Sequence, residues 1–256
     1  MGFPLGLRVV ALGAVLFGAL AAVVVRPDLM VVERIEWVGN SRATPAELRH
    51  LADLRNGTTI WSVDLGDLAA RIQRHPWVDT VSAERRFPGT VVVRVAEHAP
   101  VAVLAWGSEL FYVDEVGRPF LRADSSSLDH PFITGLTPEL EALHPELPRL
   151  VLRDAVWLLG ALDSRGLLPA SQVSEIAFHR TRGFTVQTSG AGGKHRTARV
   201  LFGFDDYERQ LNHLASLLDR GVDLTRPLHV DVAPATVAIV RPMDLPDAAL
   251  TGAARM

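Results

Sequence analysis

The sequence predicts an α+β protein with an N-terminal transmembrane helix, and three observations lead to that fold class. An unbroken apolar run covers residues 9–25. Residues 30–98 follow the pattern strand, helix, helix, strand, strand, which suits a small domain built on a three-stranded sheet. Residues 99–243 combine many short strand patterns with two helical ones, so we expect a mostly antiparallel β domain with flanking helices.

The apolar run at residues 9–25 contains no charged or polar side chain. A helix of this length spans about 26 Å, close to the ~30 Å hydrocarbon core of a bilayer. We expect an uncleaved single-pass anchor, with residues 1–8 as a short cytoplasmic tail and the rest outside the cytoplasm. A cleaved signal peptide is the alternative, because Ala19-Leu20-Ala21 has the small-x-small form of a cleavage site. The apolar residues continue past that site to Val25, which favours the anchor.

The first domain opens with a strand and a short helix. Residues 31–38 alternate apolar and charged side chains, as a half-buried strand does. Thr44 can cap the following helix, Pro45 fits its first position, and Glu47 completes a capping box. We therefore expect a helix to begin directly after Thr44.

A second helix and a hairpin complete this domain. Asp64 can cap the helix, and Pro76 prevents it from continuing. Residues 77–86 and 90–97 read as two strands joined by a Pro88-Gly89 turn. The compact solution is a three-stranded sheet with both helices on one face.

The second domain is expected to be richer in strands. Its segment 136–148 is rich in turn-forming residues, and the tail 244–256 has no periodicity and is expected to be loose. The expected strands cover residues 101–106, 110–113, 117–120, 173–179, 184–188, 199–202, 228–232 and 236–240, and the expected helices cover residues 150–162 and 207–218.

Composition and motifs argue against a catalytic, cofactor-binding or metal-binding function. Hydrophobic residues make up 48% of the chain, so a packed core is expected, and the net charge of −3 is too small to indicate a nucleic-acid partner. The absence of cysteine excludes thiolate metal sites and a cysteine nucleophile. No two histidines are spaced i, i+4, and the Gly190–Lys194 run lacks the first glycine and the Ser/Thr of a P-loop, so we read it as a hairpin loop. We predict no catalytic residue, no cofactor and no metal site.

Most of the large aromatic side chains and two arginines are expected to have structural roles. For Arg85 and Arg86 a solvated strand face is expected, with a docking surface as the alternative. The side chains expected in the core or half-buried are Trp37, Trp61, Trp77 and Trp157. Trp106 and Tyr112 are candidates for a surface.

Taken in order, six short motifs resemble those of the bacterial FtsQ/DivIB family of cell-division proteins, and they span nearly the whole chain. The motifs are Val38-Gly39-Asn40, Pro76-Trp77-Val78, Val81-x-x-x-Arg85-x-Phe87-Pro88, Glu97-x-x-Pro100-Val101-Ala102, Val113-Asp114-x-x-Gly117 and Val230-Asp231-Val232. Each is weak alone, and their order and spacing make the match specific.

The resemblance implies a POTRA domain at residues 30–98 followed by a β domain at residues 99–243. It further implies a non-enzymatic scaffold of the divisome in the inner membrane at the septum. Its implied partners are FtsB and FtsL, bound by strand addition at the last strands, with other division proteins contacting the POTRA domain. The chain departs from the family at Ala233, where the family often carries an arginine, so a salt bridge from that position is not expected.

The candidate partner-binding residues form the last expected strand, Thr236, Val237, Ala238, Ile239 and Val240. Nothing later in the chain is expected to cover the outer edge of this strand, and its five residues carry no charge. An unprotected edge invites another strand, so a bound partner strand would explain it. An ordinary strand covered by its own domain is the alternative.

Two other functional classes compete with the scaffold. A POTRA-containing protein of outer-membrane assembly or secretion normally carries a long barrel, for which this chain has no room. An exported enzyme with a signal peptide would need a convergent set of catalytic groups, and the sequence shows none.

Overall fold

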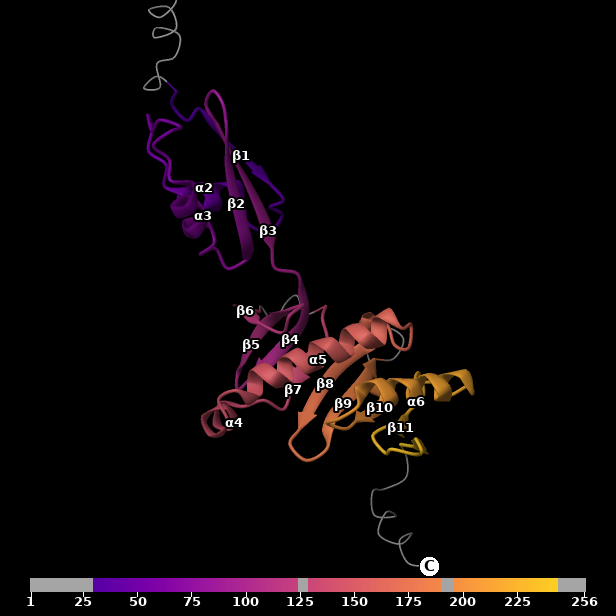
Figure 1. Cartoon of the computed structure of the whole chain (residues 1–256). Helices are drawn as coiled ribbons and strands as arrows, with labels where there is room; N and C mark the ends of the chain where they lie inside the picture. Colours follow the sequence, from indigo (N-terminus) through magenta and orange to yellow (C-terminus); the bar gives the residue numbers. More distant parts are fainter. Residues whose placement is uncertain (1–29, 124–128, 190–195, 244–256) are drawn as a thin grey trace, which may run out of the picture. The chain divides into compact units, whose positions relative to one another are not determined.

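The computed structural model describes residues 30–123, 129–189 and 196–243 (Figure 1). The chain divides into two compact units between His98 and Ala99. We call them unit 1 and unit 2 and describe each by itself.

Several expectations concern residues outside the described ranges. They are the anchor at residues 9–25, the cleavage site at Ala19-Leu20-Ala21, the loop at 190–194 and the tail at 244–256. Across the three described ranges, the structure contains no helix with the length and apolar character needed to cross a bilayer.

Unit 1 has the expected order of elements, and both helices lie on one face of its sheet (Figure 1). The sheet has three strands in the order β1-β3-β2, with β1 parallel and β2 antiparallel to the central β3. Alternate residues of β3, Val91, Val93 and Val95, join the core beneath the helices. The elements are β1 (Arg34–Val38), α2 (Pro45–Ala52), α3 (Leu65–Ile72), β2 (Val78–Arg86) and β3 (Thr90–Glu97).

Local capping explains where the two helices of unit 1 begin. The Thr44 hydroxyl accepts a hydrogen bond from the Glu47 amide, and the Glu47 carboxylate accepts one from the Thr44 amide, which confirms the capping box. The Asp64 carboxylate accepts hydrogen bonds from the amides of Gly66 and Asp67. Each cap is worth about 1 kcal/mol, a useful fraction of the stability of so short a helix.

Unit 2 is built on a nine-stranded sheet in the order β12-β11-β10-β9-β8-β7-β4-β5-β6. Five of its eight strand pairings are antiparallel, as expected. The elements are β4 (Pro100–Trp106), β5 (Glu109–Asp114), β6 (Pro119–Arg122), β7 (Phe132–Thr134), α4 (Pro138–Leu143), α5 (Leu147–Ser164), β8 (Val173–His179), β9 (Gly183–Ser189), β10 (Arg196–Phe202), α6 (Tyr207–Asp219), β11 (Leu228–Asp231) and β12 (Ile239–Pro242).

Helices α5 and α6 cover one face of this sheet (Figure 1). Leu158 and Leu162 of α5 and Leu214 of α6 are fully buried in the same core as Ile176 and Val200 of the sheet. Fully burying one such side chain contributes about 1.5–3 kcal/mol, so this shared core is the main source of stability in unit 2.

Some expectations for unit 2 were wrong. The segment 136–148 was expected to be turn-like, yet it contains α4, which Thr137 caps by accepting a hydrogen bond from the Leu140 amide. Strand β7 was not expected at all, and it joins the two halves of the sheet through parallel pairings with β4 and β8. The last strand was expected at residues 236–240 but forms at Ile239–Pro242.

The exposure of the aromatic residues corrects two further expectations. Trp61 and Trp157 are 54% and 45% exposed, whereas Trp37 and Trp77 are half-buried as expected. Tyr112, a candidate for the surface, is buried.

Candidate protein-binding edge

The Val38-Gly39-Asn40 motif allows two parts of the unit 1 backbone to approach closely. Gly39 has φ +89°, and a Cβ atom placed there would lie 2.3 Å from the Val95 carbonyl oxygen. Only glycine fits both the backbone angle and the contact. The Asn40 side-chain amide donates a hydrogen bond of 3.0 Å to the Ala43 carbonyl, which shapes the loop before α2.

The glutamate of the Glu97-x-x-Pro100 motif holds that same loop. Its carboxylate accepts hydrogen bonds of 2.8–3.0 Å from the amides of Ser41, Arg42 and Ala43. Burial raises the pKa of Glu97, but the donated hydrogen bonds from the Arg42, Ala43 and Ser41 amides outweigh it and leave the pKa lowered. The motif therefore joins the end of β3 to the start of α2.

The tryptophan of the Pro76-Trp77-Val78 motif meets the loop that Glu97 holds. The Arg42 guanidinium carbon lies 4.1 Å from the centroid of the Trp77 ring, a cation–π contact. The Trp77 carbonyl also accepts a hydrogen bond of 2.9 Å from the His98 amide. Three of the motifs thus converge on one end of unit 1, where each has a structural role.

The Val113-Asp114-x-x-Gly117 motif has a similar role in unit 2. Asp114 is only 3% exposed, and its carboxylate accepts hydrogen bonds from the Val116 amide and from the Arg118 amide and guanidinium. Gly117 has φ +82°, and its backbone lies against residues Leu152 and Arg153 of α5. This turn links the β5–β6 hairpin to the helix that covers the sheet.

The last motif forms a turn directly before the candidate edge. The Asp231 carboxylate accepts a hydrogen bond of 3.0 Å from the amide of Ala233, the residue that stands where the family often has arginine. The Pro234 carbonyl accepts a hydrogen bond of 2.8 Å from the Arg209 guanidinium of α6. The chain between β11 and β12 is therefore fastened to the body of unit 2.

Strand β12 lies at one end of the nine-stranded sheet, and among the described residues only β11 pairs with it. Of the five candidate residues, Ile239 and Val240 belong to β12, whereas Thr236, Val237 and Ala238 precede it without regular structure. The strand continues through Arg241 and Pro242, so the expectation of a charge-free edge was wrong.

The alternation of backbone hydrogen bonds along β12, which we call hydrogen-bond parity, shows which N–H and C=O groups point away from β11. The Met243 amide donates to the Pro227 carbonyl at 3.0 Å, so residue 243 turns its backbone toward β11. In an antiparallel pair, every second residue of a strand directs its N–H and C=O toward the partner strand. The backbone groups of Ile239 and Arg241 therefore also face β11. Val240 then points both its N–H and its C=O away from the sheet. Pro242 faces the same way and has only a carbonyl to offer.

The side chains of the candidate residues differ in exposure. Val237 is 63% and Val240 is 37% exposed, while Ala238 packs against the core of unit 2 and Ile239 is half-buried. The outer edge thus combines an available backbone at Val240 with apolar side chains beside it. These are the properties that a strand-shaped partner requires.

The opposite edge of the sheet has similar protection. Its edge strand β6 has four residues, begins with Pro119, and ends with Arg122, whose guanidinium forms an ion pair with Glu109. Strand β12 likewise has four residues and contains Arg241 and Pro242, so length, proline and charge do not distinguish the two edges. The β12 edge is the candidate because it contains two of the predicted residues and the outward backbone of Val240.

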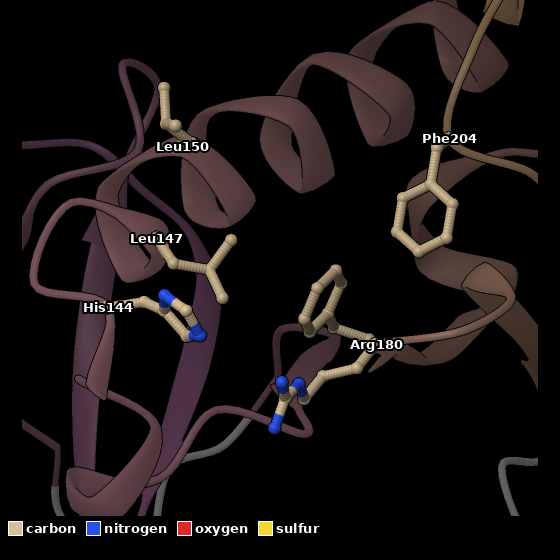
Figure 2. A pocket seen from close by; sticks show the side chains of 6 residues that line it. His144, Leu147, Leu150, Arg180 and Phe204 are labelled. Atoms are coloured by element: carbon tan, nitrogen blue, oxygen red, sulfur yellow. The ribbon is translucent and has the colours of Figure 1, made fainter. Parts of the chain in front are cut away.

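A hollow of about 300 Å³ lies elsewhere in unit 2, beside the start of α5 (Figure 2). It is lined by His144, Leu147, Leu150, Phe178, Arg180 and Phe204. The lining contains no carboxylate or hydroxyl side chain, so it holds no nucleophile paired with a general base. In the described parts of the chain, no group of three or more histidine, aspartate or glutamate residues is arranged to hold a metal ion.

Comparison with known proteins identifies a matching domain family and several similar proteins. The model of the FtsQ-type POTRA domain matches residues 30–98. Cell division protein FtsQ of Geobacter sp. strain M21 is 33% identical over 75% of this chain and 68% of its own length. This chain belongs to the FtsQ family of cell division proteins. FtsQ of Myxococcus fulvus is 36% identical over 72% of this chain, and that match spans 62% of the relative's length.

Among solved structures, the major extracytoplasmic domain of the cell division protein DivIB from Geobacillus stearothermophilus is similar to this chain. The match covers 50% of this chain and 99% of that one, at 18% identity and a TM-score of 0.28. The family assignment therefore rests on the sequence relatives.

Two features of the edge were missed at the level of sequence. Val240 was named as one of five equal candidates, although parity makes it the residue with an outward amide. Pro242 lies within β12, although the expected strand ended at residue 240. A proline is tolerated on an edge strand where its missing N–H would face outward, and that rule was the available signal.

Proposed function

We propose that this member of the FtsQ family is a non-enzymatic, membrane-anchored scaffold of the divisome. Residues 9–25 anchor it in the inner membrane, residues 1–8 stay in the cytoplasm, and units 1 and 2 act outside the cytoplasm at the septum. Its partners are FtsB and FtsL. Family membership supports the division role, and the open outer edge of β12 supports recognition by strand addition.

The outward backbone of Val240 is the observation that carries the mechanism. A partner strand beside β12 would accept a hydrogen bond from the Val240 N–H and donate one to its C=O, and the Pro242 carbonyl would accept a third. Each such bond contributes about 0.5–1.5 kcal/mol net, so the adjoining apolar side chains must add to the affinity. Because the recognition is through the backbone, it does not need an arginine at position 233.

The test removes the outward amide and keeps the sheet. Val240→Pro deletes the N–H that faces the partner, at a position where an edge strand tolerates proline. Binding of a purified FtsB–FtsL pair to the full chain in detergent should weaken about tenfold, the equivalent of 1.4 kcal/mol, because a carbonyl of the partner is left without its donor. Titration calorimetry or surface-immobilised binding would measure it.

A matched variant separates backbone from side chain. Val240→Thr changes the side chain but keeps the amide, and its affinity should stay within about threefold of that of the unmodified chain. Ile239→Pro is a poor test, because Ile239 faces β11 and its replacement would disturb the sheet itself. Unchanged binding by Val240→Pro would refute strand addition at this edge.

The membrane topology has its own test. Protease treatment of intact cytoplasmic-membrane vesicles of right-side-out orientation should digest units 1 and 2. Their protection in those vesicles would contradict the proposed placement outside the cytoplasm.

A further inference from the structure

Two large aromatic side chains of unit 1 lie together on its surface. Trp61 and Phe87 are 54% and 50% exposed, and their ring centroids are 4.6 Å apart. Two adjacent exposed aromatic rings form a contiguous apolar patch, and such patches are often sites of contact. We call Trp61 and Phe87 the aromatic pair.

The aromatic pair lies where the chain enters unit 1. The Ile60 amide, next to Trp61, donates a hydrogen bond of 2.7 Å to the Met30 carbonyl. The Gly89 carbonyl, at the turn that carries Phe87, accepts one of 2.8 Å from the Glu33 amide. Both aromatic residues are thus fastened to the first described residues of the chain.

The aromatic pair is also at the far end of unit 1 from the exit of the chain. Phe87 lies at the tip of the β2–β3 hairpin, whereas Val78 pairs with Glu97 at the other end of the same two strands. Eight residues of β3 at ~3.4 Å each separate the tip from that exit by about 25 Å. The entry end is therefore distinct from the end of unit 1 where three of the other motifs converge.

Arg85 connects the strand before Phe87 to the loop that carries Trp61. Its guanidinium donates hydrogen bonds to the Ile60 carbonyl at 2.8 Å and to the Val63 carbonyl at 2.5 Å. These bonds connect β2 to the loop on either side of Trp61. The solvated strand face expected for Arg85 was wrong, and its structural role is to fix the geometry of the aromatic pair.

The sequence places this end close to the predicted anchor. Only four residues separate Val25, the last of the apolar run, from Met30. Five steps of at most ~3.6 Å bring Met30 within about 18 Å of the end of the hydrocarbon segment. The headgroup region on each side of a bilayer is about 5–8 Å deep, so the proposed anchor would hold the start of unit 1 within about 13 Å of the membrane surface.

We infer that the aromatic pair inserts into the interfacial region of the bilayer and docks unit 1 on the membrane surface. Tryptophan favours this zone, and a half-exposed aromatic pair offers apolar area to it. Exposed Glu33 and Arg34 flank the entry with opposite charges, so binding depends on aromatic burial and only weakly on anionic lipid. The inference rests on the membrane anchor of the proposed function.

The test uses quenching of tryptophan fluorescence by brominated lipids in vesicles that contain the full chain. The chain has five tryptophans and none lies in residues 1–29, so any quenching reports on units 1 and 2. Phosphatidylcholine brominated near the headgroup end of its acyl chains should quench the unmodified chain. Trp61→Phe should lose more than half of that quenching, because it removes the fluorophore and keeps an aromatic ring.

Two controls make the result specific. Trp157→Phe removes a comparably exposed tryptophan from unit 2 and should keep the quenching of the unmodified chain. Phe87→Ser should reduce the quenching of Trp61 about twofold or more. Adding phosphatidylglycerol or 0.5 M salt should change the signal little.

The outcomes separate this inference from the proposed function. If the chain fails to float with the vesicles, the anchor is refuted and the inference falls with it. If the chain floats but Trp61→Phe is quenched as strongly as the unmodified chain, only the inference is refuted. A third outcome is a blue shift of the tryptophan emission that grows with the protein-to-lipid ratio and is not accompanied by quenching. That result would assign the aromatic pair to contact between copies of the chain and would also refute the inference.

Discussion

The motif residues and the outer edge of β12 differ in how strongly each depends on the identity of its residues. Gly39, Glu97 and Asp114 each stabilise the fold through a contact that few other residue types could make or allow. The β12 edge offers the backbone of Val240, which almost any residue would present. Residues that identify a family can therefore be structural, while a binding surface made of backbone leaves little trace in the sequence.

The largest expected effect tests the structural side of this comparison at Gly39. Gly39→Ala places a Cβ against the Val95 carbonyl and forces a non-glycine residue to positive φ, so we expect a loss of about 3 kcal/mol in the free energy of unfolding of unit 1. Gly57 also has positive φ but no atom within 4 Å of a built Cβ, so Gly57→Ala should cost about 1 kcal/mol. Hydrogen exchange of the β3 amides measures unit 1 separately from unit 2. Equal losses in the two variants would show that the close approach is unimportant.

A second effect tests the buried turn at Asp114. Asp114→Ala leaves the amides of Val116 and Arg118 without their acceptor, which should cost unit 2 about 2–3 kcal/mol. Asp231→Ala removes a carboxylate from the more exposed turn before β12 and should cost about 1 kcal/mol. Exchange of the β4 and β8 amides would measure both. A larger loss for Asp231→Ala would reverse the proposed division between structural turn and binding edge.

A third effect is the pH dependence that Glu97 contributes. Its pKa is lowered in the folded state, so its stabilisation is fully present above the unfolded pKa of about 4.3 and disappears as the pH falls through the folded pKa. Because the carboxylate is partly exposed, the effect at neutral pH should be below about 1 kcal/mol. The unfolding free energies of unit 1 in the Glu97→Gln variant and the unmodified chain should differ at pH 7 and converge below pH 4. A difference that stays constant down to pH 3 would contradict a role for the carboxylate charge.

The smallest effect concerns the edge itself. Val240→Thr should change the free energy of unfolding of unit 2 by less than about 0.5 kcal/mol, because the residue is on the surface and its backbone bonds are kept. Denaturant titration with the β10 amides as probes would detect a larger change. Such a change would mean that Val240 stabilises the fold and is not reserved for a partner.

Local signals explain which elements could be predicted. The helices of unit 1 begin directly after Thr44 and Asp64, whose side chains accept hydrogen bonds from backbone amides within the next three positions. The hairpin from 77 to 97 was visible because two strand patterns flank a Pro-Gly turn. The predicted order of unit 1 and the resemblance to the FtsQ/DivIB family were confirmed.

Long-range contacts explain what could not be predicted. Strand β7 has three residues, too few for periodicity, and exists because β4 and β8 pair with it on either side. The start of β12 is set by its register with β11, so its own composition did not reveal it. Glu97 was recognised as part of a motif, but the amides that it binds lie more than 50 residues earlier. The anchor at residues 9–25 stays a prediction.

The most direct test of the account is the hydrogen exchange of the Val240 amide with and without an FtsB–FtsL pair. In the free chain this amide faces away from β11 and should exchange at nearly the rate of an unstructured peptide. With partner bound, we predict that its exchange slows by at least about tenfold, while the already paired Ile239 amide changes less. Continued fast exchange at Val240 in a chain that is saturated with partner would contradict strand addition at β12.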